Sequence, residues 1–178
     1  MAHGVIAASP QVGQFIEMTS TPVPADLAAL YAQHHEAVFH AALRVTGNPA
    51  DAEDVLQTVF LRVLSGSKPD ASAGRPAAYF RRAAVNAAVD LLRRRAVHAA
   101  TAYDDEAPHA AVEPAPLLKA QLRRAIATLD RDDASLFLLR YVEGLSNQEL
   151  ADLFQLEKNN VAVRLHRIRM RLQAEIER

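Results

Sequence analysis

The sequence contains no cysteine and no tryptophan, and aromatic residues make up only 6% of it. The lack of cysteine excludes disulfides, thiolate metal sites and cysteine nucleophiles. No apolar run approaches the roughly 20 residues that a membrane-spanning helix needs. The chain also begins without the charged and apolar segments that together make a signal peptide. We therefore expect a protein of the reducing cytoplasm that does not insert into membranes.

Alanine, in contrast, is abundant and accounts for 35 of the 178 residues. Alanine favours helices over strands, so much of the 50% hydrophobic content is helix-forming. Apolar residues recur with helical spacing through most of the chain, and no segment has the alternation of a strand. The sequence therefore predicts an all-α protein.

Turn residues and composition divide the chain into two small helical domains joined by a flexible linker. The first domain includes a helix that Asn48 caps and Pro49 opens. The linker is rich in alanine, proline and acids and has no lysine or arginine, which is typical of a flexible connection. The predicted boundaries are 1–24 for an N-terminal tail, 25–96 for the first domain, 97–116 for the linker and 117–178 for the second domain.

The formal net charge of −1 conceals blocks of opposite sign. Residues 51–54 hold three acids and no base, whereas residues 75–95 hold six arginines against Asp90 alone. Residues 164–171 hold four arginines and no acid. Arginine suits bidentate contacts with phosphates and base edges. One basic helix could simply expose a solvated face, but two of them, one in each domain, favour nucleic-acid binding.

The second domain contains the pattern of a helix-turn-helix. Ser146 and Glu149 form a capping-box pair at the start of its first short helix. Leucines and valines spaced along residues 150–165 can seal a small core between two helices. The second of these helices would lie in a DNA major groove, with arginines on phosphates. The alternative is an ordinary helical hairpin.

No pattern of titratable residues predicts catalysis or a bound metal. His34, His35 and His40 share a predicted helix, but no two of them have the i,i+4 spacing of paired ligands. No nucleophile–base pair and no glycine-rich phosphate loop is present. We expect no metal site, no cofactor and no enzymatic activity.

Several segments together resemble the bacterial sigma factors. The segment 48–62 resembles the core-binding part of sigma region 2, and 75–95 resembles the helix that follows it. The segments 145–151 and 161–172 resemble sigma region 4. The two regions are joined directly, with no room for regions 1.1 or 3, which is the layout of the extracytoplasmic-function (ECF) sigma factors. The resemblance implies a transcription initiation factor that binds core RNA polymerase, directs it to specific promoters and assists melting of the −10 element.

The resemblance also implies three sets of site residues. The set that would dock on the β′ clamp helices of RNA polymerase is Asp51, Glu53, Asp54 and Gln57. The set that would bind the −10 element is Lys68, Arg75, Arg81, Arg82, Asn86, Arg93 and Arg94. The set that would bind the −35 element is Asn159, Asn160, Val163, Arg164, Arg167 and Arg171.

Structural alternatives accompany some of these assignments. Helix capping explains Asp51, and compensation of the helix dipole explains Glu53 and Asp54. Phe80, beside the −10 set, is expected in the core, and Asp90 is expected to pair with an arginine three or four residues further along the same helix.

The second domain departs from the usual pattern of region 4 in three places, one of which is Ala162 and Val163 in place of a common Lys-Ser pair. Gln155 stands where a glycine commonly makes the turn, and a left-handed backbone there would cost roughly 1–2 kcal/mol. Asn159 and Asn160 replace the usual Gly-Thr pair before the recognition helix. Asparagine can read adenine through a bidentate contact, so the departure predicts an altered −35 preference or weaker −35 binding.

The resemblance also implies partners and a location. Besides the β′ clamp helices, the β flap of the polymerase, promoter DNA and an anti-sigma factor are expected partners. The protein would lie on the nucleoid when active and at the membrane where an anti-sigma factor holds it there. Two alternatives stay open: a sigma-like decoy that sequesters an anti-sigma factor, and a helix-turn-helix repressor whose first domain dimerises.

Overall fold

The computed structural model describes residues 25–66, 76–101 and 114–177. Within these ranges the chain forms helices and no strand, which confirms the all-α prediction. The predicted N-terminal tail, the polar loop that holds Lys68 and Arg75, and most of the predicted linker lie outside the described residues. The helices are α1 (Ala25–Thr46), α2 (Pro49–Leu64), α3 (Pro76–Thr101), α4 (Pro114–Thr128), α5 (Arg131–Tyr141), α6 (Asn147–Phe154) and α7 (Lys158–Ile176).

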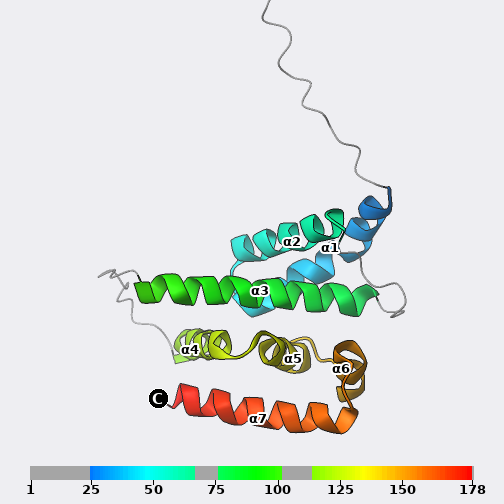
Figure 1. The fold of residues 1–178 in the computed structure, drawn as a ribbon. Coiled ribbons are helices and arrows are strands. Elements are labelled where there is room, and N and C mark those ends of the chain that lie inside the picture. The colour runs from blue at the N-terminus through cyan, green and yellow to red at the C-terminus, as the bar shows by residue number, and fades with distance from the viewer. Residues whose placement is uncertain (1–24, 67–75, 102–113, 178) are drawn as a thin grey trace, which may run out of the picture.

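The long helix α3 lies at the centre of the molecule (Figure 1). Helices α1 and α2 pack on one side of it, and together the three helices form what we call the N-terminal unit. Helices α4 and α5 pack on its other side and separate it from α7. Helices α4 to α7 form the C-terminal unit. Helix α3 therefore has α1 and α2 on one side and the C-terminal unit on the other.

The core of the N-terminal unit combines small and branched side chains. Ala42 of α1 and Ala84 of α3 are fully buried, and such small residues let helices approach closely. Val59 of α2 and Val85 of α3 fill the space between the helices. Phe80 is also fully buried, which confirms its predicted place in the core. These contacts fix the face that α3 turns toward the C-terminal unit.

The ends of the central helices follow from local residues. The Asn48 side chain accepts hydrogen bonds from the backbone of Ala50 and Asp51, with Pro49 at the first helical position, as predicted. Helix α3 runs to Thr101, beyond its predicted end, because no glycine or proline stands between residues 96 and 101 to stop it. The segment between α3 and α4 is therefore shorter than the predicted linker.

The turn between α6 and α7 has the predicted helix-turn-helix form. The Ser146 hydroxyl accepts from the backbone N–H of Glu149, whose carboxylate accepts from the backbone N–H of Ser146. Gln155 ends α6 in a left-handed conformation, with φ 54° and ψ 45°. It is the one residue other than glycine with a positive φ in the described ranges. The strained backbone predicted for a turn without glycine is therefore present.

None of the helices in the described ranges combines the length and the apolarity that crossing a membrane requires.

Candidate nucleic-acid interface

Helix α7 presents most of the predicted −35 set to solvent. Its buried positions are Val161, Leu165, Ile168 and Leu172, which recur at helical spacing and fix α7 against the rest of the C-terminal unit. The opposite side of α7 is consequently open. Exposed members of the predicted −35 set on this side are Asn159, Asn160, Val163, Arg167 and Arg171, while Arg164 is partly buried.

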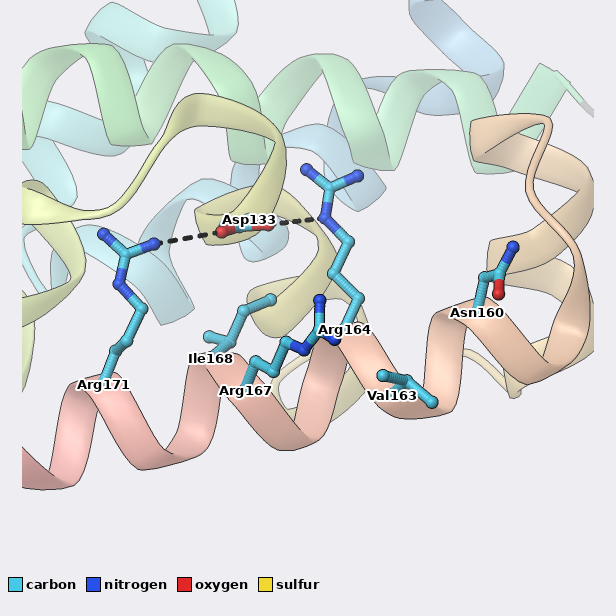
Figure 2. Close-up of a pocket in the computed structure, with 7 residues that line it drawn as sticks. All are labelled: Asp133, Asn160, Val163, Arg164, Arg167, Ile168 and Arg171. Carbon is cyan, nitrogen blue, oxygen red and sulfur yellow. Dashed lines mark hydrogen bonds and ion pairs between the residues drawn. The ribbon is translucent and has the colours of Figure 1, made fainter.

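A surface pocket of about 480 Å³ lies between α7 and the start of α5 (Figure 2). Its polar centre is Asp133, a residue of α5 that is only 9% exposed. The Arg164 Nε donates to Asp133 Oδ1 at 2.6 Å, and Arg171 Nη1 donates to Asp133 Oδ2 at 3.4 Å. Asp133 therefore holds two of the three arginines predicted to contact phosphates.

Asp133 is a site residue that the sequence analysis missed. It lies in the first turn of α5, where a carboxylate is favoured by the helix dipole, so the sequence alone gives it a sufficient local explanation. Its neighbour Asp132 has the same sequence context but is exposed. Only the packing of α5 on α7 selects Asp133 as the partner of Arg164.

The predicted −10 set on α3 lies in a different environment, against the C-terminal unit. Arg82 Nη1 donates to the backbone oxygen of Leu153 in α6 at 2.6 Å. The Arg82 guanidinium carbon also lies 4.2 Å from the centre of the Phe154 ring, in a cation–π arrangement. Burial lowers the pKa of Arg82 from its ordinary value, Asp132 opposes this effect and Arg131 adds to it. The Arg82 guanidinium is thus bound by α6 of the C-terminal unit.

Two further members of the −10 set contact α5 and the turn that precedes it. The Asn86 Oδ1 accepts a hydrogen bond from the hydroxyl of Ser135, which is fully buried. The Arg93 Nη2 donates to the backbone oxygen of Leu129. Arg94 is exposed, and Arg81 is partly exposed. Within the part of the −10 set that the structure describes, Arg82, Asn86 and Arg93 are therefore occupied by the C-terminal unit.

The predicted pairing of Asp90 within α3 is wrong. Asp90 Oδ2 instead accepts from Arg131 of α5 at 2.8 Å and lies 3.8 Å from Arg62 of α2. Helix α3 turns this carboxylate toward the helices on its two sides, so its partners come from distant parts of the chain.

Helix α2 presents a mixed acidic and apolar face. Glu53, Asp54 and Gln57 are exposed, as docking on a partner requires. Leu61 and Leu64 continue the same face and are 62% and 53% exposed. Spacings of three and four residues place these positions on one side of the helix.

Asp51 is placed differently from the other members of the predicted polymerase-binding set. It is only 3% exposed, and both of its oxygens accept from Arg95 of α3 at 2.5 Å. Asn48, rather than Asp51, caps α2. The position of Asp51 therefore indicates that it joins α2 to α3, while the exposed acids remain on the outer face.

Two family models match the chain. Sigma-70 region 2 matches residues 30–97, and Sigma-70 region 4 matches residues 119–172. The matched ranges include α2, most of α3, the helix-turn-helix and most of α7. Together they cover the described helices that carry the candidate site residues.

Several curated proteins are similar in sequence. The chain is 32% identical over 142 residues to the RNA polymerase sigma factor CarQ of Myxococcus xanthus, covering 78% of this chain and 82% of that protein. It is 30% identical over 151 residues to the ECF RNA polymerase sigma factor SigE of Mycolicibacterium smegmatis, covering 80% of this chain. The chain spans only 58% of the length of that relative. The RNA polymerase sigma-E factor of Streptomyces avermitilis is 28% identical over 145 residues, with 80% of each protein covered.

Two solved structures are similar to the chain. One is CnrH in complex with the cytosolic domain of CnrY, with 22% identity, a TM-score of 0.49 and coverage of 85% of this chain and 87% of that one. The other is the sigma factor RpoE in complex with the anti-sigma factor NepR from Bartonella quintana. That chain has 17% identity and a TM-score of 0.47, with coverage of 85% of this chain and 97% of that one.

Proposed function

The chain belongs to the extracytoplasmic-function (ECF) family of RNA polymerase sigma factors, which are transcription initiation factors, and we propose that α2 binds core polymerase while α3 and α7 bind promoter DNA. In this proposal the chain supplies recognition, and the catalysis belongs to the polymerase. The observation that carries it is the helix-turn-helix, because its second helix α7 is buried along one stripe and presents asparagine, valine and arginine on the other.

The exposed side of α7 supports binding to the −35 element. Asn159, Asn160 and Val163 lie at the N-terminal end of α7, where a recognition helix meets base edges. Asparagine can make a bidentate contact with adenine, and valine can touch a thymine methyl group. Arg164, Arg167 and Arg171 follow along the helix and would neutralise phosphates.

The outer face of α2 supports docking on core polymerase. Its exposed acids and Gln57 suit a basic, hydrogen-bonding partner, and the exposed leucines next to them would be buried on docking. The family resemblance makes the β′ clamp helices that partner, and it makes the β flap the partner of the C-terminal unit. Glu53, Asp54 and Gln57 are the residues that we assign to this contact; Asp51 supports it by joining α2 to α3.

The arginines of α3 support binding of the −10 strand after melting. Holding a single strand needs a cationic surface that follows the phosphates, together with polar or stacking contacts to bases. Arg81, Arg82, Arg93 and Arg94 could supply the charge, and Asn86 could supply a base contact. Lys68 and Arg75, which belong to the same proposed set, lie outside the described residues.

The family resemblance also suggests regulation by an anti-sigma factor. RpoE of Bartonella quintana was solved with such a partner, NepR. We assign the same class of partner to this chain, and with it a cytoplasmic location, on the nucleoid when the factor is active and at the membrane when a membrane-bound anti-sigma factor holds it.

Run-off transcription with purified core polymerase and candidate promoters tests the proposed function. Wild-type protein is expected to bind core and start transcripts at specific promoters, whereas Asp54→Lys is expected to bind core more than tenfold more weakly. Glu36→Lys is the matched control, because it makes the same change in charge at an exposed site of α1. Failure of the wild type to bind core would sink the proposal. Core binding without initiation, combined with tight anti-sigma binding, would favour the decoy.

A further inference from the structure

We propose that the face of α3 assigned to the −10 strand is also the docking surface for the C-terminal unit of the same chain, so that DNA and the C-terminal unit compete for it. The inference rests on the proposed function, because it names what regulates access to the −10 set. In the docked arrangement the free protein masks its own −10 surface. Binding of the −10 strand then requires the two units to separate.

Arg82 shows most directly that docking of the C-terminal unit and binding of the −10 strand exclude each other. Its guanidinium donates to the Leu153 carbonyl in the last turn of α6 and lies over the Phe154 ring. Carbonyls in a last turn lack helical partners, so Arg82 satisfies an acceptor that would otherwise need water. A DNA phosphate would need the same guanidinium. Arg82 therefore exchanges one partner for the other and does not hold both.

Asn86 and Arg93 extend the masked surface along α3. The amide oxygen of Asn86 accepts from Ser135, and the guanidinium of Arg93 donates to the Leu129 carbonyl. Asp90, between them in sequence, pairs with Arg131 of α5. The same stretch of α3 thus faces α5 and the turn before it over about two helical turns. A single strand following this stretch would have to displace that surface.

Contacts outside the −10 set hold the two units together at their edges. Arg44 of α1 forms a bidentate ion pair with Glu143, with both distances 2.8 Å. Arg123 of α4 donates to the Val45 carbonyl at 3.0 Å, at the C-terminal end of α1. A Cβ on Gly47 would overlap the Arg123 guanidinium, so glycine permits this close approach. Docking therefore has determinants that can be changed without touching the −10 set.

The packing between α3 and α6 is consistent with an interface that opens. A pocket of about 380 Å³ lies there, lined by residues of both units that include Tyr79, Arg82 and Phe154. A second pocket of about 340 Å³ lies beside it, lined by Asn86 and Leu153 among others. The interior of a permanent core is close-packed. Contacts between domains of one chain commonly allow relative motion, so this edge is the place where separation would begin.

Competition has a quantitative consequence for DNA binding. If only the separated form binds the −10 strand, the apparent dissociation constant equals the intrinsic one divided by the separated fraction. A covalent bridge between the units should weaken −10 binding, and a substitution that disfavours docking should strengthen it. Neither change should alter binding of a −35 duplex, because α7 is exposed in the docked form.

The first experiment bridges the units with the double variant Arg44→Cys, Glu143→Cys. The sequence has no other cysteine, so a reversible bis-methanethiosulfonate reagent can join only these two thiols within a chain. Binding is measured by fluorescence anisotropy with a single-stranded −10 oligonucleotide from a promoter that the run-off assay identifies. The bridged protein is expected to bind it at least tenfold more weakly, with recovery on reduction. Inability to form the bridge in free protein would overturn the docked arrangement.

The second experiment weakens docking with Arg131→Glu, which places a negative charge beside Asp90. This variant is expected to bind the −10 oligonucleotide at least threefold more tightly, although it adds a negative charge that by itself would weaken DNA binding. Arg124→Glu is the matched control: Arg124 is exposed on α4 and has no hydrogen bond or ion pair with the described part of the N-terminal unit. The control is expected to bind no more tightly than the wild type.

The outcomes separate this inference from the proposed function. Equal −10 binding by wild-type, bridged and Arg131→Glu proteins would overturn the competition and leave −10 binding by the chain intact. Absence of −10 binding in all three, with −35 binding retained, would overturn the assignment of the −10 strand to α3 and the competition with it.

Discussion

Helices α3 and α7, the two arginine-rich helices of this sigma factor, have similar charge but opposite accessibility. Helix α7 exposes most of the predicted −35 set, whereas Arg82, Asn86 and Arg93 of α3 are engaged by the C-terminal unit. The difference does not come from the type of charged residue, because arginine supplies most of the charge of both helices. It comes from position: α7 has a partner on one side, and α3 has partners on both.

Even on α7, the accessibility of the side chain differs from one arginine to the next. Arg164 and Arg171 share the carboxylate of Asp133, while Arg167 is exposed and forms no ion pair with any described residue. A phosphate can approach Arg167 directly but must compete with Asp133 for its neighbours. Counting arginines therefore overstates the charge that α7 offers to DNA.

Among substitutions that test the difference between α3 and α7, the largest effect on DNA binding is expected from Arg167→Ala. Loss of an unpaired phosphate contact should weaken −35 duplex binding about tenfold and lower the slope of log K against log salt by about one. Arg169→Ala is the control, because Arg169 is also exposed on α7 but lines a different pocket, next to Leu122 and Phe137. A salt titration by fluorescence anisotropy measures both quantities. An unchanged slope would remove Arg167 from the phosphate set.

Asp133→Asn should have a smaller effect, in the opposite direction. Removing the negative charge of Asp133 releases the ion pair of Arg164 and leaves Arg171 only the longer contact with Asp130, at 4.0 Å. Binding to a duplex of unrelated sequence should therefore strengthen by roughly three- to tenfold. The ratio of specific to non-specific affinity should fall, because the two guanidiniums lose the partner that orients them. Asp132→Asn makes the same change in charge one residue away at an exposed site and is the control. Equal effects of the two variants would contradict a positioning role for Asp133.

Local features of the helix ends could be predicted from the sequence, whereas contacts between side chains of different helices could not. The cap at Asn48, the capping box at Ser146 and the strained turn at Gln155 each depend on a few adjacent residues. Their side chains and backbone meet through short-range geometry that residue type largely determines.

The residues whose surroundings differ from the prediction have partners on other helices, and these partners depend on which helices pack together. Asp90 pairs with α5 and α2 instead of its own helix, and Asp51 is buried against Arg95 instead of facing a partner protein. For each of these residues, sequence spacing offers an adequate role within its own helix. Only the three-dimensional packing shows that its actual partner lies on another helix. For the same reason the sequence indicates that α3 is basic but does not show that the C-terminal unit covers it.

Gln155→Gly is expected to stabilise the C-terminal unit modestly. Glycine adopts the left-handed backbone without the strain that another residue has, although it also loses more conformational entropy on folding. The net gain should be about 1 kcal/mol in the free energy of unfolding, measured by chemical denaturation. Glu157→Gly is the control, because Glu157 has a negative φ and no strain to relieve. Destabilisation by Gln155→Gly would mean that contacts of the glutamine side chain outweigh its backbone strain.

The smallest effect is expected from acid, and it should distinguish the two units. His34 of α1 is only 5% exposed, stacks on Phe80 with ring centres 4.5 Å apart, and has a buried Nε2 without a hydrogen-bond partner. Burial disfavours the imidazolium and lowers the pKa of His34 below its ordinary value of 6.5. Below that ordinary pKa the unfolded chain binds more protons than the folded one at this site. The free energy of unfolding should therefore decline as pH falls through the range just below 6.5.

Replacing His34 should remove this pH-dependent part of the stability and leave the rest. In His34→Leu, the free energy of unfolding should change less between pH 7 and pH 5 than in the wild type, whatever its value at pH 7. His40→Leu, at an exposed site of the same helix, should keep the wild-type dependence. If the docked units separate before they unfold, the N-terminal unit alone carries this acid sensitivity, and hydrogen exchange at pH 5 should increase in α1 before it increases in α7. Simultaneous increases in both helices would instead show that docking couples the two units into one unfolding event.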